Sequence, residues 1–270
     1  MRALRIVIVI NLGLLMSGGC ATERGRVEAP GPATVAPKYY ICHRTDLEII
    51  VDGWLDDRAW QGAPWTDTFS DIEGPAKPAP RYRTRVKMLW DDVYLYVAAR
   101  LEEPHVWATL TERDAIVFHD NDFEIFIDPN GDAREYYEIE VNALNTIFDL
   151  FLERTYLDGG PARHEWNLEG MRSAVAIDGT LNDPSDVDAG WSVEFALPWR
   201  ALGEWAHRPA PPDLDDVWRM NFSRVQWRHV IKDGRYEKVA GAPEDNWVWS
   251  PQGAVNMHLP RRWGCVCFDR

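Results

Sequence analysis

The chain has 270 residues, with 29 Lys and Arg against 43 Asp and Glu and a formal net charge of −14 at pH 7. This charge argues against nucleic acid as a partner, because an acidic surface repels phosphate backbones. Hydrophobic residues make up 46% of the chain and charged residues 27%, which is typical of globular proteins and excludes disordered and collagen-like classes. The 14 Trp residues either fill a core or supply flat platforms for a ligand.

The N-terminal segment has the pattern of an export signal. Arg2 and Arg5 precede the apolar residues 6–16, and two glycines then lead into Cys20. A basic region, a short apolar region and small residues, in that order, predict a signal peptide over residues 1–19. The motif resembles the lipobox of bacterial lipoproteins, which implies that Cys20 is diacylated and becomes the new N-terminus. The alternative is a plain secretory signal with an incidental cysteine.

Residues 20–38 are rich in Pro, Gly, Ala and Thr and lack apolar periodicity, which predicts a flexible tether. We expect one folded domain over residues 39–270. Ala21 after Cys20 does not resemble the aspartate that retains lipoproteins in the inner membrane. The expected location is therefore the cell envelope, with the lipid anchor in the outer membrane of a host that has one.

Six segments alternate polar with apolar residues, the pattern of strands that bury one face. They are residues 83–90, 93–101, 122–128, 136–142, 191–197 and 218–225. Asp91 and Asp92 are expected to form the turn between the first two strands, and residues 129–132 to connect the next pair. This spacing predicts an all-β fold, an antiparallel β-sandwich of jelly-roll or immunoglobulin-like type, with a short helical turn at residues 198–202.

Three cysteines remain after export, namely Cys42, Cys265 and Cys267. An exported protein meets an oxidising compartment, in which a disulfide persists. Cys265 and Cys267 share one face if they lie on a strand, so only one of them pairs readily with Cys42. We therefore expect one disulfide and one free thiol. A metal site is the weaker alternative, because the paired CxxC spacing is missing.

The strongest motif is DGWLDDRAW at residues 52–60, after an expected strand LEIIV at residues 47–51. It resembles the opening DG-x-LD-x-x-W of family 9 carbohydrate-binding modules. Further blocks follow in that family's order, namely LWDDVYLYVAARLEEP, DNDFEIFIDPNGDAREYYEIEVNALNTIFD, GWSVEFALPW, WRMNFSRV and HLPRRWG. The resemblance runs from about residue 40 to the C-terminus, and it implies a β-sandwich that binds carbohydrate without catalysis.

Clustered carboxylates are the main candidates for a binding site. If the third and fourth expected strands pair as a hairpin, Glu124, Glu138 and Glu140 lie on one face beside Asn142. The resemblance implies that Glu124 and Asn142 contact sugar. Glu138 and Glu140 stand where characterised members of the family carry Gln and Arg, so the particular ligand is expected to differ.

So many acids on one face repel one another unless a cation, an arginine or a shared proton relieves them. Arg224 is the expected source of positive charge, and Arg113 is the alternative. The competing interpretation of the whole cluster is an ordinary acidic face in contact with solvent.

The resemblance also implies two tryptophans that clamp the sugar, but Phe118 and Met257 stand at those places. Phe118 offers a ring for stacking, whereas Met257 is a poor flat platform. Four tryptophans are the candidate substitutes, above all Trp247 and Trp249, which share one strand face, and then Trp107 and Trp166. Four others are expected in the core, namely Trp60, Trp90, Trp191 and Trp263.

Residues 128–132 resemble the start of a calcium loop, with Asp128, Asn130 and Asp132 at alternate positions. The loop is not completed in the required form, so we expect a hairpin turn. Because family 9 modules bind structural calcium, the resemblance leaves calcium open as a cofactor; no other cofactor is expected.

These features predict the carbohydrate-binding domain of an exported, lipid-anchored protein that takes part in polysaccharide capture or catabolism, with a glycosidase or an envelope protein as its partner. One alternative is a glycoside hydrolase that uses Glu138 and Glu140, since two residues of strand span about 7 Å. Another is a structural or protein-binding envelope lipoprotein. A haem held by Met and His is the remaining alternative; adjacent Met257 and His258 would point to opposite faces of a strand and so would not both ligate the iron.

Overall fold

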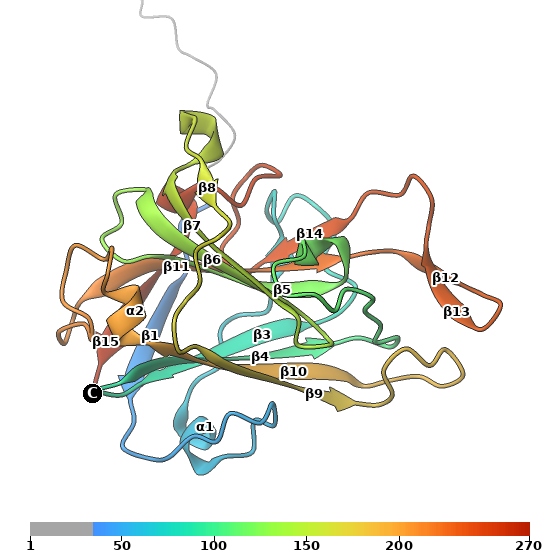
Figure 1. Ribbon diagram of the computed structural model, residues 1–270, viewed down its shortest axis with the longest axis horizontal. Helices are drawn as coiled ribbons and strands as arrows, with labels where there is room; N and C mark the ends of the chain where they lie inside the picture. Colours follow the sequence, from blue (N-terminus) through green and yellow to red (C-terminus); the bar gives the residue numbers. More distant parts are fainter. Residues whose placement is uncertain (1–34) are drawn as a thin grey trace, which may run out of the picture. The chain divides into compact units, whose positions relative to one another are not determined.

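A computed structural model describes residues 35–270 of the protein (Figure 1). The signal peptide over residues 1–19, the lipidation of Cys20 and most of the expected tether lie outside the described residues. β1 (Tyr39–Arg44) is the first strand of the described part. Among residues 35–270, no helix is long and apolar enough to cross a bilayer.

Thirteen strands within the described residues hydrogen-bond into one sheet. The order is β8-β7-β6-β5-β11-β15-β1-β3-β4-β10-β9; β14 also pairs with β11, and β2 pairs with β14. After β1, the strand bounds are β2 (Ser70–Asp71), β3 (Thr84–Trp90), β4 (Tyr94–Glu102), β5 (Asp122–Asp128), β6 (Arg134–Asn142), β7 (Ile147–Arg154), β8 (Ala162–Arg163), β9 (Arg172–Asp178), β10 (Gly190–Pro198), β11 (Val217–Gln226), β14 (Asp245–Val248) and β15 (Gly264–Asp269).

The sheet forms two layers that face each other across one apolar core. Phe123 of β5 and Phe222 of β11 lie in the same buried cluster as Val97 of β4 and Val193 of β10. Alternation along the strands directs apolar side chains into this core, and the removal of apolar surface from water stabilises the two-layer arrangement. In Figure 1, β3, β4, β10 and β9 form one layer and β5, β6 and β7 belong to the other. The predicted all-β sandwich is confirmed.

The sheet is mixed rather than purely antiparallel. β1 pairs in parallel with β15 on one side and with β3 on the other, whereas the other pairings are antiparallel. Parallel neighbours need a long connection, and the segment between β1 and β3 provides one that contains α1 (Arg58–Gly62). Ala59 and Trp60 of α1 pack against Tyr96 and Ala98, on the outer face of the β4 layer.

The remaining elements are short. They are α2 (Trp199–Leu202), the 3₁₀ turns η1 (Val117–His119), η2 (Tyr156–Asp158) and η3 (Pro260–Arg262), and the separate hairpin of β12 (His229–Lys232) and β13 (Arg235–Lys238). All six segments with strong alternation are strands. Their ends differ from the expected ends by at most two residues. The helical turn expected at residues 198–202 is α2.

One predicted strand is wrong. Residues 47–51 form an irregular segment before α1 and pair with no strand. The backbone N–H of Ile50 donates instead to the carboxylate of Asp57, which closes a local loop. The sequence did not predict β7 as a strand. Six of its eight residues are buried, so the strand has no exposed face on which polar residues would alternate with apolar ones.

The four tryptophans expected in the core are buried there. Trp60, Trp90, Trp191 and Trp263 are each at most 4% exposed. Trp199, which opens α2, is also buried and donates its indole N–H to the backbone oxygen of Asp91. The tryptophan excess therefore serves the packing of the sandwich to a large extent.

The predicted disulfide is wrong, because Cys42, Cys265 and Cys267 are free thiols. Cys42 of β1 lies beside Phe268 of β15, and both side chains are in the core. Cys265 and Cys267 differ from Phe268 by odd numbers of positions, so they point to the other face of β15. They do share a face, as expected, but it is the face away from Cys42.

Candidate binding pocket

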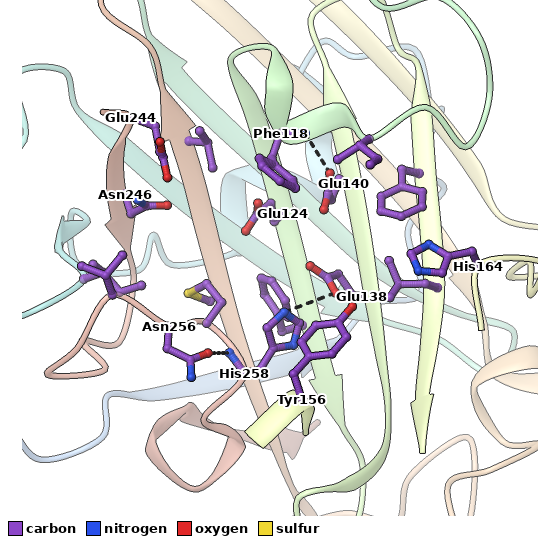
Figure 2. A pocket seen from close by; sticks show the side chains of 18 residues that line it. Phe118, Glu124, Glu138, Glu140, Tyr156, His164, Glu244, Asn246, Asn256 and His258 are labelled. Carbon is purple, nitrogen blue, oxygen red and sulfur yellow. Dashed lines mark hydrogen bonds and ion pairs between the residues drawn. The ribbon is translucent and has the colours of Figure 1, made fainter. Parts of the chain in front are cut away.

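A pocket of about 400 Å³ opens on the outer face of β5, β6 and β7, away from the core (Figure 2). Alternation along these strands sends Phe123 and Ile139 into the core and turns Glu124, Glu138 and Glu140 outward to the pocket. A volume of this size lies within the range of small-molecule binding sites. The expected hairpin of β5 and β6 is therefore the floor of the pocket.

The carboxylates of this hairpin crowd together. Glu124 lies directly opposite Glu140 in the register of β5 and β6, and Asp122 lies opposite Asn142. Glu124, Glu138 and Glu140 are 5%, 6% and 2% exposed, and Asp122 is fully buried. Because water has so little access to these four carboxylates, their charges are poorly screened.

Burial raises the pKa of each of these carboxyls. The pKa of Glu124 rises to about 7 because of burial, although the Ser223 hydroxyl opposite it limits the rise. Burial and then the charge of Glu124 raise the pKa values of Asp122, Glu138 and Glu140 well above their usual range. Proton sharing is therefore one way in which the cluster is relieved.

Positive charge does not relieve the cluster. Among residues 35–270, no Lys or Arg forms an ion pair with these four carboxylates. His258 lies 3.9 Å from Glu138, but burial lowers its pKa to about 4, so its ring is neutral at neutral pH. Arg113, the second expected source of charge, pairs with Asp149 instead.

Aromatic side chains line the pocket from two 3₁₀ turns. Phe118 of η1 is 37% exposed, and Tyr156 of η2 is 48% exposed. The backbone N–H of Phe118 donates to the Glu140 carboxylate at 2.9 Å, which ties η1 to the floor. Tyr156 packs edge-on against His258, with ring centroids 4.5 Å apart. Figure 2 shows Phe118 and Tyr156 with the three glutamates between them.

Of the nine sugar-contact residues expected from the sequence, five line the pocket. They are Phe118, Glu124, Glu138, Glu140 and Met257. Met257 is 9% exposed and belongs to the apolar cluster under the pocket. The structure thus brings Phe118 and Met257 together with the three glutamates in one pocket.

Asn142 and Arg224 do not line the pocket, which corrects their expected role. The amide of Asn142 donates to the backbone of Leu110 and accepts from the backbone of Leu144, so it holds a turn. Arg224 is fully buried on the other face of β11 and forms an ion pair with Glu103 at 3.3 Å. Both side chains therefore stabilise the domain from within.

The tryptophan substitutes are also corrected. Trp247 and Trp249 do share a face, but they are 3% and 1% exposed and belong to the core. Trp107 is 3% exposed, and Trp166 packs against Tyr137 and the core. None of these four tryptophans lines the pocket on β5, β6 and β7.

Sequence reasoning missed pocket residues that lie on turns and loops. They are Tyr156, His164, Glu244, Asn256 and His258, together with Asn246 at the start of β14. No periodic signal marks such positions. Met257 and His258 both face the pocket because their segment is a loop, so the expectation that they point to opposite faces is wrong.

The turn at residues 128–132 fits a hairpin rather than a calcium loop. Both carboxylate oxygens of Asp128 accept backbone N–H groups, from Gly131 and Ala133. Asn130 and Asp132 hydrogen-bond to each other and to the adjacent backbone. These oxygens point into the turn, and the expected hairpin accounts for all three side chains.

The two-layer sandwich and its outward pocket define a β-sandwich domain with a cavity of the size of small-molecule sites. Residues 51–214 match the model of the family described as Carbohydrate family 9 binding domain-like. The chain belongs to this family, and the resemblance inferred from its motifs is confirmed.

Curated relatives include Exoglucanase XynX of Acetivibrio thermocellus, 26% identical over 153 residues, and endo-1,4-beta-xylanase A of Thermoanaerobacterium saccharolyticum, 27% identical over 153 residues. Each match covers 57% of this chain but only 12% and 11% of the two relatives. The chain thus corresponds to a small part of these enzymes.

Two solved structures of family 9 modules from Caldicellulosiruptor kristjanssonii have the same fold. One is in complex with cellotriose, with a TM-score of 0.55 and 15% identity over 86% of this chain and 94% of that one. The other is in complex with glucose, with a TM-score of 0.56 and 15% identity over 86% of this chain and 97% of that one. At this identity the similarity concerns the fold.

Proposed function

We propose that the protein captures oligosaccharide or polysaccharide in the pocket on β5, β6 and β7 and releases it unchanged. One observation carries the proposal, namely that exposed aromatic rings and buried carboxylates line the same pocket in a domain of the carbohydrate-binding family 9. Sugars present apolar C–H faces and hydroxyl edges, so they need both kinds of partner. Family 9 modules in complex with cellotriose and glucose support this ligand class.

Each part of the pocket has a role in this proposal. Phe118 and Tyr156 offer ring faces for stacking on the sugar. Glu138 and Glu140 accept hydrogen bonds from sugar hydroxyls when they are ionised. When they are protonated, they can also donate a hydrogen bond to a hydroxyl oxygen. Asn246 adds an amide that both donates and accepts. The replacement of the tryptophan clamp by Phe118 and Met257 favours a looser ligand fit than in modules that have the clamp.

The spacing of the acids does not separate binding from hydrolysis. A retaining glycosidase needs two carboxyls about 5 Å apart, and an inverting enzyme needs a wider gap for water. One oxygen of Glu124 and one of Glu140 lie within 4.8 Å of each other, which is close to the retaining distance. The assay for reducing ends therefore decides between the two functions.

The cellular setting is also part of the proposal. Basic, apolar and small residues before Cys20 support export and lipid anchoring, and Ala21 supports an outer-membrane location. A carbohydrate-binding domain tethered in the envelope would hold polysaccharide near a partner glycosidase and so serve its catabolism. The occurrence of related segments in xylanases is in keeping with such a partner.

Calorimetric titration of the purified protein against a panel of cello-, xylo- and bacterial-envelope oligosaccharides tests the proposal. We expect saturable binding to at least one ligand and no new reducing ends in the same mixtures. Phe118→Ala should weaken that binding about tenfold, the contribution of one stacked ring. Tyr39→Ala is the matched control, since Tyr39 is an exposed aromatic residue outside the pocket.

Release of reducing sugar would replace the proposal with the hydrolase alternative. If circular dichroism shows that the protein is folded and no ligand of the panel binds, the structural or protein-binding alternative would replace the proposal. Equal losses in Phe118→Ala and Tyr39→Ala would move the binding site away from this pocket.

A further inference from the structure

A second pocket, of about 200 Å³, opens on the outer face of the other layer. Arg100 of β4, Asp178 of β9 and Ser192 of β10 line it. Ala99 and Leu101, on either side of Arg100 along β4, belong to the core, so alternation turns Arg100 outward. α1 packs on the same side of this layer, which faces away from β5, β6 and β7 (Figure 1). The two pockets therefore lie on opposite outer faces of the sandwich.

Two indoles border this second pocket, and they differ in what covers them. The ring of Trp65 is covered by cations, with the guanidinium carbon of Arg85 at 4.8 Å and the ammonium nitrogen of Lys87 at 4.7 Å from the ring centre. Trp54 is 48% exposed, and within the described chain no aromatic ring or cation packs on it. Trp54 is thus the indole with a ring face free for a ligand.

Hydrogen bonds fix the backbone that carries Trp54. The backbone N–H of Trp54 donates to the carboxylate of Asp52 at 2.9 Å. The backbone of Gly53 donates to the carboxylate of Glu194 at 2.8 Å and accepts the Ser192 hydroxyl at 2.6 Å. A group that is already held in place loses less conformational entropy when a ligand binds. The fixed backbone of Trp54 therefore suits this residue to contact a ligand.

Polar groups of both kinds accompany the indole. Arg100 and Asp178 form an ion pair at 3.3 Å, with side chains 62% and 55% exposed. Such an exposed pair contributes little to stability, so the fold does not require it. The pair offers hydrogen-bond donors and acceptors side by side, which match neighbouring sugar hydroxyls. Asp56, which also lines the pocket, adds an acceptor and disfavours anionic ligands.

We propose that this second pocket binds one unit of a neutral polysaccharide, with Trp54 stacked on the sugar ring and Arg100 and Asp178 hydrogen-bonded to its hydroxyls. The indole face takes the apolar C–H groups of the ring. The pocket is smaller than those that enclose drug-sized ligands, so it holds a single sugar unit while the glycan continues outside. We call it the Trp54 site.

The Trp54 site goes beyond the proposed function and does not require the pocket on β5, β6 and β7 to be occupied. Because the two pockets lie on opposite faces, one protein molecule holds two glycan chains at once. Two weak sites on one molecule retain a polysaccharide longer than either site does alone.

NMR spectroscopy of the purified, isotope-labelled protein tests the Trp54 site. Each indole N–H gives its own signal, and the signal lost in Trp54→Phe is that of Trp54. Titration with cellotriose and with xylotriose should shift this signal saturably for at least one of them, with a midpoint of about 1–10 mM. Arg100→Gln should raise that midpoint about tenfold. Tyr39→Ala is the matched control, since Tyr39 is an exposed aromatic residue outside both pockets.

Three results would overturn the proposal. The first is a Trp54 signal that neither sugar shifts at roughly 50 mM. The second is an equal midpoint in wild type and in Arg100→Gln, with the variant folded by circular dichroism, because the ion pair would then not contact the sugar. The third is a Trp54 signal that moves with protein concentration alone, because a second copy of the chain would then cover the indole.

Calorimetry with the same sugars separates this inference from the proposed function. The Trp54 midpoint should be unchanged in Phe118→Ala, and Trp54→Ala should keep the binding that depends on Phe118. A Trp54 response in a protein whose pocket on β5, β6 and β7 binds no glycan would refute the proposed function and leave the Trp54 site standing. Binding that is lost in Phe118→Ala, with no Trp54 response, would do the reverse.

Discussion

The carboxylate of Glu194 on β10 accepts the indole N–H of Trp60 on α1 at 2.6 Å, so a fully buried acid joins α1 to the outer face of the β4 layer. Its other oxygen accepts the backbone N–H groups of Asp52 and Gly53 at 3.0 and 2.8 Å. One side chain thereby satisfies three donors from the DGWLDDRAW motif. This contact explains in physical terms why the motif joins Asp, Gly and Trp at fixed spacing.

Glu194→Ala should therefore destabilise the domain by about 3 kcal/mol, because the buried donors of Trp60 and Gly53 and the partly buried donor of Asp52 lose their acceptor. Urea denaturation followed by tryptophan fluorescence measures the free energy of unfolding. Glu102→Ala is the control, since Glu102 forms an exposed ion pair with Arg83 and should cost less than about 1 kcal/mol. Similar losses in the two variants would show that the Glu194 contacts contribute little.

Asp128 should make the stability of the domain depend on pH. Burial raises its pKa from 3.8 to about 6, so the folded state holds the proton more tightly than the unfolded chain does. The stability that this carboxyl contributes is fully present below about pH 4 and is lost as the pH rises through about 6. A rise of two pKa units corresponds to roughly 3 kcal/mol.

Asp128→Asn removes this titration. The free energy of unfolding of the variant, relative to wild type, should improve by roughly 3 kcal/mol between about pH 4 and pH 7. Denaturant titrations at a series of pH values measure the difference, in which contributions from other groups cancel. A constant difference across the series would contradict the raised pKa.

Arg224→Met should destabilise the domain by about 3–5 kcal/mol, because it leaves Glu103 buried without its cation. Arg224→Met combined with Glu103→Gln should recover part of that loss. The glycan affinity of the folded variant should equal that of wild type, since Arg224 does not line the pocket. A selective loss of glycan binding would restore Arg224 to the binding site.

The thiols should differ in reactivity. An alkylating reagent added to the native protein should modify Cys267, which is partly exposed, and leave the fully buried Cys42 intact, as mass spectrometry of tryptic peptides would show. Reducing agent should leave the melting temperature unchanged, because no disulfide links the described cysteines. A fall in melting temperature on reduction would show that a disulfide is present after all.

The sequence allowed the sandwich and the acidic floor of the pocket to be predicted, because both follow from side-chain alternation. Glu124, Glu138 and Glu140 share a face through the period of two along β5 and β6. The same period correctly put Trp247 and Trp249 on a common face. Alternation alone did not show that this face is buried, because Trp247 packs against Tyr82 and Trp249 packs against Phe222, both distant in sequence.

The rest of the pocket depends on long-range packing. Tyr156 and His258 are separated by about a hundred residues and meet because η2 and a late loop lie beside the same hairpin. Neither segment has a periodic pattern. Arg224 pairs with Glu103 rather than with the pocket acids because its side chain points to the inner face of β11. Alternation along β11 did not show which of the two faces that would be.

The hydrogen bond from the backbone of Phe118 to Glu140 has an evolutionary consequence. An arginine at position 140 would reverse the charge of the floor and at the same time remove the acceptor that fixes the aromatic turn. A lineage could not exchange one ligand preference for another by changing this position alone, because each step would also loosen the ring above it. Because the donor is a backbone N–H, a change of the side chain at position 118 would keep this bond, whereas a change at position 140 would remove it.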